Sequence, residues 1–449
     1  MRPVWRAEAG LALALAVAAP ARAQTPDSAV AAGAVRRAPS AGPLRLADVY
    51  RELEARSPRV RAARAAAQAA EARIGPARRP PDPQVQFGLM NRDLPGFGLN
   101  EPLGMNQVQV TQMVPIAGKL GLAARAARAQ ASAAGYRATD ALWEQRARAA
   151  GVFYDLYQTD RSLEVAEETQ QLIRQLAAVA AAMYRVGEAR QPDLLRAQVE
   201  VSRMTEEIVR MQAMREGQAA QLNALLDRPA TDSVPTPEPP PTPGELPPGD
   251  SLVALALLQR PELHAGEQDV AAAAAAEQRA RREIWPDLEV GVIYGQRGMP
   301  EGGTDRMLSL MLGFSVPIWA GSRQGQMRQE AGAMRRMAEA DLGAMQAETR
   351  ARVIELAAAI RRSGRLSRLY RGTVLPQATA TTTSALAAYR VGQVDFMTVL
   401  DNQMTVNRYR TELIVLDAEG GRAVAELEML LASPLSDASG SNVVPGGTR

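Results

Sequence analysis

Few residues in this sequence have side chains suited to catalysis or to holding a metal. The chain contains no Cys and a single His, His264, which excludes thiolate nucleophiles, histidine-based triads and zinc sites made of several histidines. His264 stands on an Ala-rich stretch with Glu262 and Glu267 close by, and this setting predicts a solvated surface position. We therefore expect no catalytic residues, no enzyme activity and no cofactor.

Methionine thioethers are the soft ligands that remain. Five of them stand in or beside segments in which polar and apolar residues alternate: Met90, Met105, Met113, Met307 and Met311. Thioethers bind Cu(I), so a soft-metal relay is one interpretation. Apolar filling and contact with lipid are the more common uses of methionine, and we assign no metal site from the sequence.

A duplicated segment organises the rest of the chain. The sequence Tyr-Arg-Val-Gly occurs at Tyr184–Gly187 and again at Tyr389–Gly392, and residues further along also agree without a gap, as Leu195 and Leu400 do. Each copy lies between two long helical patterns, and its Gly tolerates the positive φ that a tight turn needs. We predict two helical hairpins with these segments as their tips, built from one supersecondary unit used twice.

Each hairpin is preceded by two segments with the period of a β-strand. Val85, Phe87 and Leu89 alternate with polar or small residues, and the pattern recurs over 106–114, 288–295 and 307–314. Alternation at a period of two predicts strands with one apolar and one polar face. Helical patterns then run over 119–183 and 322–389, and at 1.5 Å per residue the first helix would be roughly 100 Å long.

These patterns divide the chain into six segments. Arg2 and Arg6 precede an apolar run and an Ala-x-Ala motif that ends at Ala23, which is typical of a cleaved secretory signal. We expect a signal peptide over 1–23, a flexible leader over 24–43, a first repeat over 44–228, a Pro-rich linker without packed structure over 229–249, a second repeat over 250–434 and a disordered tail over 435–449.

Charge and hydropathy indicate a membrane and not a nucleic acid as the environment. The formal net charge is only +3, and the arginines are spread along helical stretches as solvated faces would be. No stretch after the signal approaches about 18 uninterrupted apolar residues, so insertion into a membrane must use strands. Four strands cannot close a barrel, whereas three chains would supply twelve. A soluble hairpin pair with one buried face is the alternative, and the signal peptide and long helices favour the barrel.

In such a barrel the alternating residues would divide between lipid and lumen. The polar set would face a wet lumen: Gln84, Gln86, Gln107, Gln109 and Glu289. Trp285 and Trp319 flank the second strand pair, where interfacial aromatic residues are expected. The fold class predicted from the residues is mainly α with a small transmembrane β part.

Several of these features resemble one family. The Tyr-Arg-Val-Gly tips, the Val-Pro-Ile segments at 114–116 and 316–318 and the internal duplication are similar to those of the TolC-type outer-membrane factors, the outer-membrane efflux proteins, over 44–434. The resemblance implies a trimer in which three protomers form a 12-stranded β-barrel, continued by an α-helical tunnel of long coiled-coil hairpins in the periplasm. Pro81-Asp82-Pro83, Met90-Asn91 and Pro115-x-x-Gly118-Lys119 resemble the heavy-metal-efflux branch in particular.

The resemblance implies a passive outer-membrane channel of a tripartite efflux system. Its partners would be two further copies of the chain, a periplasmic adaptor protein, an inner-membrane pump and outer-membrane lipid, with no nucleic acid. Its substrates would be heavy-metal cations or small-molecule drugs. The alternative is a periplasmic adaptor protein, but adaptors carry one hairpin flanked by lipoyl-like β segments. Two hairpins, each with its own strand pair, favour the channel.

The resemblance also assigns residues at the tips. Val-Leu-Asp at 399–401 places Asp401 on a gate position of the family, and Thr398 occupies the neighbouring gate position that is acidic in relatives. Asp395 and Asp193 are further acidic candidates for the gate, although Asp at the start of a return helix also suits a cap. The positions that meet the adaptor are occupied by Val186, Gly187, Val391 and Gly392.

Overall fold

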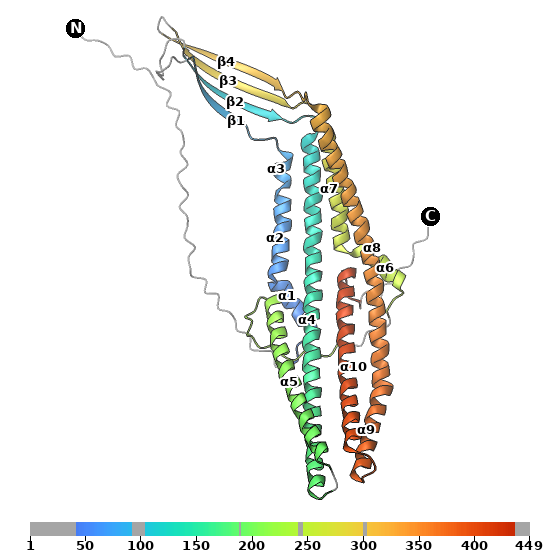
Figure 1. Ribbon diagram of the computed structural model, residues 1–449. Coiled ribbons are helices and arrows are strands. Elements are labelled where there is room, and N and C mark those ends of the chain that lie inside the picture. Colours follow the sequence, from blue (N-terminus) through green and yellow to red (C-terminus); the bar gives the residue numbers. More distant parts are fainter. Residues whose placement is uncertain (1–41, 92–103, 188–189, 241–245, 300–302, 436–449) are drawn as a thin grey trace, which may run out of the picture. The chain divides into compact units, whose positions relative to one another are not determined.

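The structure, a computed structural model, describes residues 42–91, 104–187, 190–240, 246–299 and 303–435. These residues belong to one compact unit of long helices and a single sheet (Figure 1). The predicted signal peptide lies outside the described residues, as do most of the predicted leader and tail. The predicted fold class, mainly α with a small β part and an internal duplication, is confirmed.

The two repeats share one order of elements: helices, a strand pair, a long helical stretch and a return helix. The first holds α1 (Leu46–Arg56), α2 (Pro58–Ala72), α3 (Ile74–Arg78), β1 (Gln84–Met90), β2 (Met105–Val114), α4 (Lys119–Arg185) and α5 (Gln191–Leu225). The second holds α6 (Gly249–Gln259), α7 (Pro261–Arg282), β3 (Leu288–Gly298), β4 (Thr304–Phe314), the π-helical turn η1 (Ala320–Gln324), α8 (Gly325–Leu369), the π-helical turn η2 (Tyr370–Val374), α9 (Leu375–Arg390) and α10 (Phe396–Leu431). No described helix combines the length and the apolar character needed to cross a membrane.

Prolines interrupt helices that the periodicity alone would continue. The helical stretch that opens each repeat is divided, with α2 beginning at Pro58 and α7 at Pro261. Proline lacks the N–H that a helix interior requires and suits the first helical position. The second long helix, predicted as one run, contains η2 just before Pro376. In a regular α-helix the Pro376 ring would clash with the carbonyl group four residues earlier, and a wider turn relieves that clash.

The four strands form one antiparallel sheet in the order β1-β2-β3-β4. Strand β2 of the first repeat pairs with β3 of the second, so the two strand pairs join. One face carries the apolar positions, with Val110 opposite both Val85 and Val292. The other face carries polar positions, with Gln109 opposite Gln86. The predicted alternation is therefore confirmed by the register.

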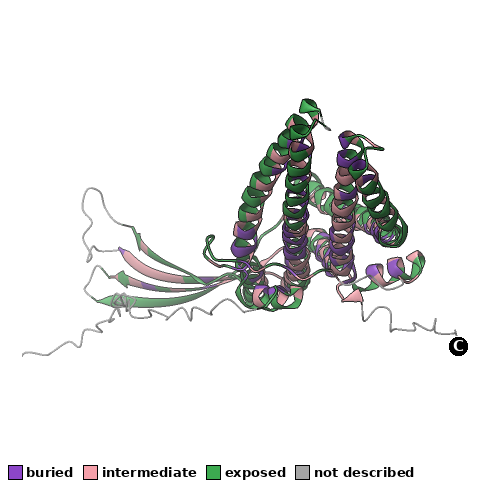
Figure 2. Cartoon of the chain, turned by 90° about the horizontal axis from the view of Figure 1, so that it is seen from below, coloured by how far each residue is buried: buried purple, intermediate pink, exposed green. Residues whose placement is uncertain are grey.

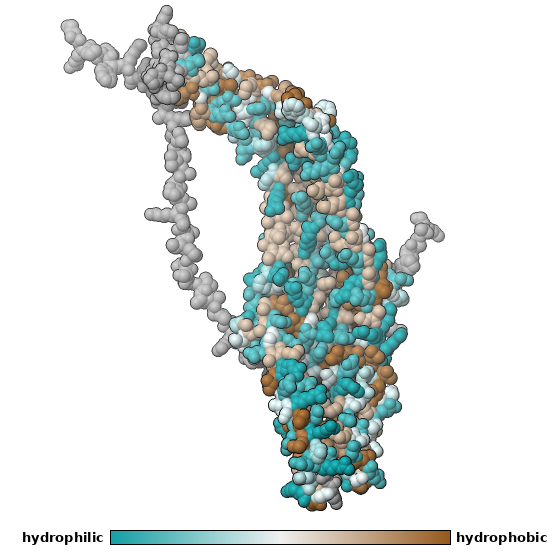
Figure 3. Space-filling model, in the orientation of Figure 1, coloured by the Kyte–Doolittle hydropathy of each residue, from teal (hydrophilic) through white to brown (hydrophobic). Residues whose placement is uncertain are grey.

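The apolar face of the sheet is open to solvent in the single chain. Phe87 is 77% exposed and Leu308 76%, and Figure 3 shows hydrophobic residues over part of the strand region. Soluble monomers rarely expose such a face. The outer edges of β1 and β4 also have no partner strand among the described residues, which leaves rows of backbone donors and acceptors open. The sheet therefore requires an apolar surrounding and further strands.

A buried lysine joins the two repeats where the sheet meets the helices. Lys119, the first residue of α4, is 5% exposed. Its Nζ donates to Asp287 Oδ1 and to the carbonyl oxygen of Trp285, each at 2.9 Å, and lies 3.4 Å from a carboxylate oxygen of Glu283. A buried charge needs partners of this kind to offset its lost hydration. These contacts hold the start of α4 against the segment that leads into β3.

Three clusters of buried residues hold the helices together. The first joins α1, α2, α4 and α5, with Leu53, Phe153 and Leu222 at its centre and alanines of α10 at its side. The second joins α6, α8 and α10 and includes Leu252 and Leu427. The third lies near the tips. Figure 2 shows the buried residues along the facing sides of the helices. Because α10 contributes to all three clusters, it connects the repeats along its length.

Part of the predicted linker packs against the first cluster. Val234 is 5% exposed, and its carbonyl oxygen accepts a hydrogen bond from Arg215 Nη2 at 2.9 Å. The backbone of Leu44 donates to Thr236 and accepts from Glu238, both at 2.9 Å. This ordering differs from the expectation of a linker without packed structure, because one valine among the prolines supplies an apolar side chain and the start of the first repeat supplies backbone partners.

His264 is not the freely solvated residue that the sequence predicts. Its side chain is 32% exposed, and its ring lies 5.2 Å from the ring of Tyr136 on α4. Its Nε2 is 2.9 Å from the carbonyl oxygen of Leu258, and its Nδ1 is 3.2 Å from Glu267. The residues next to His264 in the sequence could not predict its partial burial, because Tyr136 belongs to a helix of the other repeat.

Candidate functional site at the hairpin tips

Both tips turn on a glycine in the left-handed region. α4 ends at Arg185 and Gly187 follows with φ of +83°. α9 ends at Arg390 and Gly392 follows with φ of +71°. Nothing lies within 4 Å of the place where a Cβ would stand at either glycine, so the backbone conformation, and not crowding within the chain, selects glycine here.

A valine stands beside the glycine at each tip. Val186 is 71% exposed and Val391 67%, and each follows the last residue of its helix directly. A single exposed valine needs no explanation, but here the same residue recurs at the end of both hairpins. The two tips therefore each present an apolar side chain next to a glycine.

A buried cluster joins the two hairpins behind their tips. Tyr389 and Phe396 are 5% and 1% exposed, and their rings meet edge to face with centroids 5.9 Å apart. Ile173 of α4 and Ala197 of α5 belong to the same cluster. The hairpins of the two repeats are thus held against each other by an aromatic pair of the second repeat.

Three of the predicted gate residues follow one another along the start of α10. Asp395, Thr398 and Asp401 are exposed and three residues apart, which places them on one side of the helix. Phe396 and Val399 are buried on the other side. The polar stripe therefore points away from the cluster behind the tips.

Asp395 is the N-cap of α10. Its Oδ1 accepts a hydrogen bond from the Thr398 backbone N–H at 3.0 Å and another from the Thr398 hydroxyl. These hydrogen bonds hold the pKa of the Asp395 carboxyl below its usual value. Asp395 thus takes the capping role, one of the two considered for it, and the first helical turn of the second return helix is secured.

The side-chain carboxylate of Asp401, unlike that of Asp395, has no bonding partner among the described residues. Within the described part of the chain no ion pair or side-chain hydrogen bond forms to it, and only its backbone carbonyl accepts a bond, from the Thr405 hydroxyl at 2.9 Å. An exposed carboxylate without a cation partner can interact with solvent and with passing ions.

Asp193 lies on the other hairpin, in the first turn of α5, where the N-cap position belongs to Arg190. The side chain of Arg190 makes no capping hydrogen bond to this helix. Burial, and after it the negative charge of the Asp193 carboxylate, raises the pKa of Tyr389 at the second tip. The Tyr389 hydroxyl has no hydrogen-bond partner among the described residues.

Two arginines at this junction were not singled out in the sequence. Arg190 acts on Asp395 and contributes to its lowered pKa, and Arg196 Nη1 lies 3.1 Å from the Sδ of Met397. In the alignment of the repeats these arginines occupy the positions of Asp395 and Asp401. That charge reversal was a signal in the sequence. Among the described residues, no group of three or more His, Cys, Asp or Glu could hold a metal ion.

The sequence matches the family described as "Outer membrane efflux protein" twice, over residues 49–228 and 252–433. The two matches cover most of the chain and correspond to its two copies of the unit. The chain belongs to the outer membrane efflux protein family. The predicted family is therefore confirmed, and no curated protein sequence matches the chain significantly.

Solved structures share the fold of this outer membrane efflux protein. CusC is 16% identical with a TM-score of 0.74, covering 86% of this chain and 92% of its own. VceC from Vibrio cholerae is 16% identical with a TM-score of 0.74, covering 87% and 96%. A membrane protein from Pseudomonas aeruginosa is 18% identical with a TM-score of 0.75, covering 89% and 92%. At these identities the likeness establishes the fold.

Family and fold together establish the general role. This outer membrane efflux protein is a component of an efflux channel in the outer membrane, and its helical part is a periplasmic tunnel segment. The family consists of passive channels and not of enzymes. The predicted location is confirmed.

The long helices of this outer membrane efflux protein meet along a polar seam between the repeats. Thr169 of α4 donates to the side chain of Asn407 on α10 at 2.9 Å. Arg410 pairs with Glu168 at 2.7 Å between the same helices. Such contacts are directional, so they fix how α10 is aligned along α4 and hence where the polar stripe of α10 lies.

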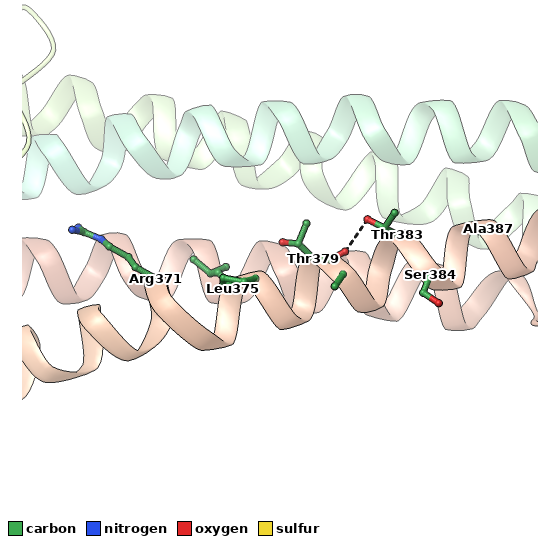
Figure 4. A pocket seen from close by; sticks show the side chains of 8 residues that line it. Arg371, Leu375, Thr379, Thr383, Ser384 and Ala387 are labelled. Atoms are coloured by element: carbon green, nitrogen blue, oxygen red, sulfur yellow. Dashed lines mark hydrogen bonds between the residues drawn. The ribbon is translucent and has the colours of Figure 1, made fainter.

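A shallow groove runs along α9 in the hairpin of the second repeat. Figure 4 shows its lining on one side of the helix, with the Thr383 hydroxyl donating to the carbonyl oxygen of Thr379 at 2.9 Å. Most residues that line the groove have small side chains. The lining residues are Arg371, Leu375, Pro376, Thr379, Ala380, Thr383, Ser384 and Ala387. Small side chains leave room for the close approach of another helix.

Proposed function

We propose that three copies of this chain assemble into the passive exit duct of a tripartite efflux system. The observation that carries the proposal is the exposed apolar face of a four-stranded sheet with two open edges. Joining β1 and β4 edges of three copies closes twelve strands, an even number of the kind found in outer-membrane barrels. Closure pairs the edge backbone groups, which lipid cannot satisfy.

The helical hairpins of the three copies continue the barrel as a tunnel. The groove on α9 receives a helix of the neighbouring copy, because its small side chains permit close packing. Trimers in the outer membrane, detected by crosslinking or by heat modification on gels, are the expected result. A monomer released into the soluble periplasmic fraction would contradict the assembly.

Asp401, Thr398, Asp395 and Asp193 form the gate. Three copies place each residue in a ring, and rings of like charge select ions of the opposite sign. Asp401 is the principal member, because its carboxylate has no partner among the described residues, whereas Asp395 is engaged as a cap. Thr398 contributes a polar, uncharged position to the same stripe.

Val186, Gly187, Val391 and Gly392 form the docking surface for a periplasmic adaptor protein. Exposed valines beside left-handed glycines let the backbone of a partner hairpin approach closely. Through the adaptor, an inner-membrane pump delivers the substrates, heavy-metal cations or small-molecule drugs. The duct itself supplies no energy.

Substitution of the tip glycines tests the docking. Gly187→Leu with Gly392→Leu should abolish efflux while trimers remain in the outer membrane, because the added bulk blocks the partner. Gly187→Ala with Gly392→Ala is the matched control, since Ala meets the same positive-φ strain but adds little volume. Undiminished export by the Leu variant would overturn the docking assignment.

Planar bilayer recordings test the gate. Asp401→Asn keeps the shape of the side chain and removes its charge, so conductance or cation selectivity should change. Glu412→Gln removes an exposed charge from the same helix further from the tip and should leave both unchanged. Identical channels from wild type and Asp401→Asn would remove Asp401 from the gate.

A further inference from the structure

The two repeats build their strand pairs in the same register. The Pro-Asp before β1 and before β3 aligns the first strands of the repeats, and the Val-Pro-Ile after β2 and after β4 aligns the second strands. In this alignment Gln84 corresponds to Glu289, and Thr111 corresponds to Gly313. Gln84 is paired with Thr111 in one repeat, and Glu289 is paired with Gly313 in the other. The duplication therefore extends to the strand pairing, and a contact in one repeat predicts its counterpart in the other.

The seam between the repeats, where β2 pairs with β3, combines strand pairing with a buried ion pair. Val110 lies opposite Val292 on the apolar face. Where the seam meets the helices, Lys119 Nζ donates to Asp287 Oδ1 at 2.9 Å, and both side chains are mostly buried. Lys119 is the first charged residue after β2, and Asp287 directly precedes β3. The ion pair thus joins the segment that leaves one strand to the segment that enters the next.

In the proposed trimer the same kind of seam forms again between copies, because β4 and β1 have no partner on their outer edges among the described residues. Transfer of the β2-β3 register places Leu312 opposite Phe87 of the next copy, and Phe314 opposite Val85. These four side chains are 55–77% exposed in the single chain. The transferred register keeps all four on the apolar face, whereas a slip by one residue would set apolar residues against polar ones.

Transfer of the ion pair leads to two residues that have no partner in the single chain. Arg323 is the first charged residue after β4, and Asp82 stands where the second repeat has Asp287. Both are exposed, and within the described part of the chain neither side chain forms an ion pair or a hydrogen bond. Arg323 follows its Val-Pro-Ile segment two residues later than Lys119 does, and the π-helical turn η1 takes up the extra residues.

We propose that Arg323 of one copy pairs with Asp82 of the next copy at each seam between copies. The inference rests on the proposed trimer and adds a specific contact to it. Each copy gives Arg323 to one neighbour and Asp82 to the other, so the contact is incomplete in a single chain. A guanidinium group can hold a carboxylate through two parallel N–H bonds, which suits a contact that also fixes the orientation of the copies.

One part of the site within the chain is not repeated. Glu283, the second carboxylate near Lys119, corresponds to Arg78 in the first repeat. The ion pair between copies therefore has one carboxylate only, and we expect it to be weaker than the pair within the chain. Proximity is the more direct readout for such a pair, and its effect on the stability of the trimer is the second.

Crosslinking between introduced cysteines tests the proximity, because the chain has no Cys of its own. Residues of an ion pair stand further apart than a disulfide allows, so a short bismaleimide is the probe. In outer membranes, Asp82→Cys with Arg323→Cys should give covalently linked trimers on denaturing gels. Asp82→Cys with Arg328→Cys is the matched control. Arg328 is equally exposed but lies five residues on, off the side of the helix that carries Arg323, and should give no linked trimer.

The gels also separate this inference from the proposed function. Native trimers of the Asp82→Cys, Arg323→Cys variant without linked species would overturn the ion pair alone, as would equal linking in the Arg328→Cys control. A wild-type chain that forms no trimer would overturn the assembly and the ion pair with it.

Charge reversal tests whether the two charges interact. Asp82→Arg and Arg323→Asp should each lower the temperature at which trimers dissociate on gels by several degrees, because each sets like charges against one another. The double variant restores opposite charges and should recover at least half of the loss. Arg328→Asp, which reverses a charge away from the seam, should leave the dissociation temperature unchanged. A double variant no more heat-stable than the single variants would overturn the ion pair.

Discussion

The two hairpin tips share the sequence Tyr-Arg-Val-Gly and a left-handed glycine, yet they are packed differently. Tyr184 of the first tip is 44% exposed, whereas Tyr389 of the second is 5% exposed. Tyr389 lies against Phe396, the first residue of α10, and the equivalent position in the first repeat is Gln191, which has no ring to offer. The residue that begins the return helix therefore decides whether the tip tyrosine is buried.

The N-terminal caps of the two return helices also differ, and again the second repeat has the additional contact. Asp395 caps α10, whereas Arg190 at the N-cap of α5 makes no side-chain hydrogen bond to the helix. The second tip thus has both an aromatic contact and a cap that the first tip lacks. Regions with fewer such contacts open more readily, so we expect the first tip to be the more mobile half of the gate.

Removing the contact between Tyr389 and Phe396 should abolish most of the difference in packing between the two tips. Phe396→Ala should destabilise the second hairpin by about 3–5 kcal/mol, because it deletes a fully buried ring. Gln191→Ala at the equivalent position of the first hairpin should change stability by no more than about 0.5 kcal/mol. Guanidinium denaturation followed by circular dichroism would measure both, and equal effects would refute the comparison.

The return helices provide a second contrast. A Cβ on Gly421 of α10 would lie 2.5 Å from the ring of Tyr154 on α4, whereas nothing lies within 4 Å of that point at Gly217 of α5. Gly421→Ala should therefore cost about 1–3 kcal/mol through overpacking. Gly217→Ala should instead stabilise by up to about 1 kcal/mol, because Ala favours a helix interior. A stabilising Gly421→Ala in the same denaturation assay would contradict the close approach of α4 and α10.

A cap can be installed where the first tip lacks one. Arg190→Ser places a hydroxyl where it can accept from the backbone N–H of Asp193, and the gain should be about 0.5–1 kcal/mol. Hydrogen exchange of the first turn of α5 should slow accordingly. Asp395→Ser, which exchanges one capping residue for another, is the control and should leave the first turn of α10 nearly unchanged.

The smallest effect is expected from pH. Hydrogen bonds from Thr398 lower the pKa of Asp395 below its ordinary value of 3.8, so its stabilising effect is complete above that value and is lost as the pH falls through the lower, folded-state pKa. Acid should therefore weaken the protection of the first turn of α10 against hydrogen exchange. No corresponding effect is expected in the first turn of α5, where Arg190 stands at the N-cap. Asp395→Asn still caps without titrating, and persistence of the acid response in that variant would assign it to another group.

Local patterns in the sequence predict most of the elements. The strands follow from residues two positions apart, and the tips follow from one glycine each. The placement of Met105 and Met113 on the polar face of β2 likewise follows from their spacing with Gln107 and Gln109. What no local pattern could predict is a contact with a distant segment, such as His264 against Tyr136 or Val234 against the first cluster.

By itself the sequence determined that the chain duplicates a unit of strands and helical hairpin, and with that its family. Only the tertiary structure decided that β2 of the first repeat pairs with β3 of the second, and that of two identical tip tyrosines Tyr389 is the buried one. The reason is the range of the forces. Backbone preferences act between residues a few positions apart, whereas strand register and side-chain burial join residues that only the folded chain brings together.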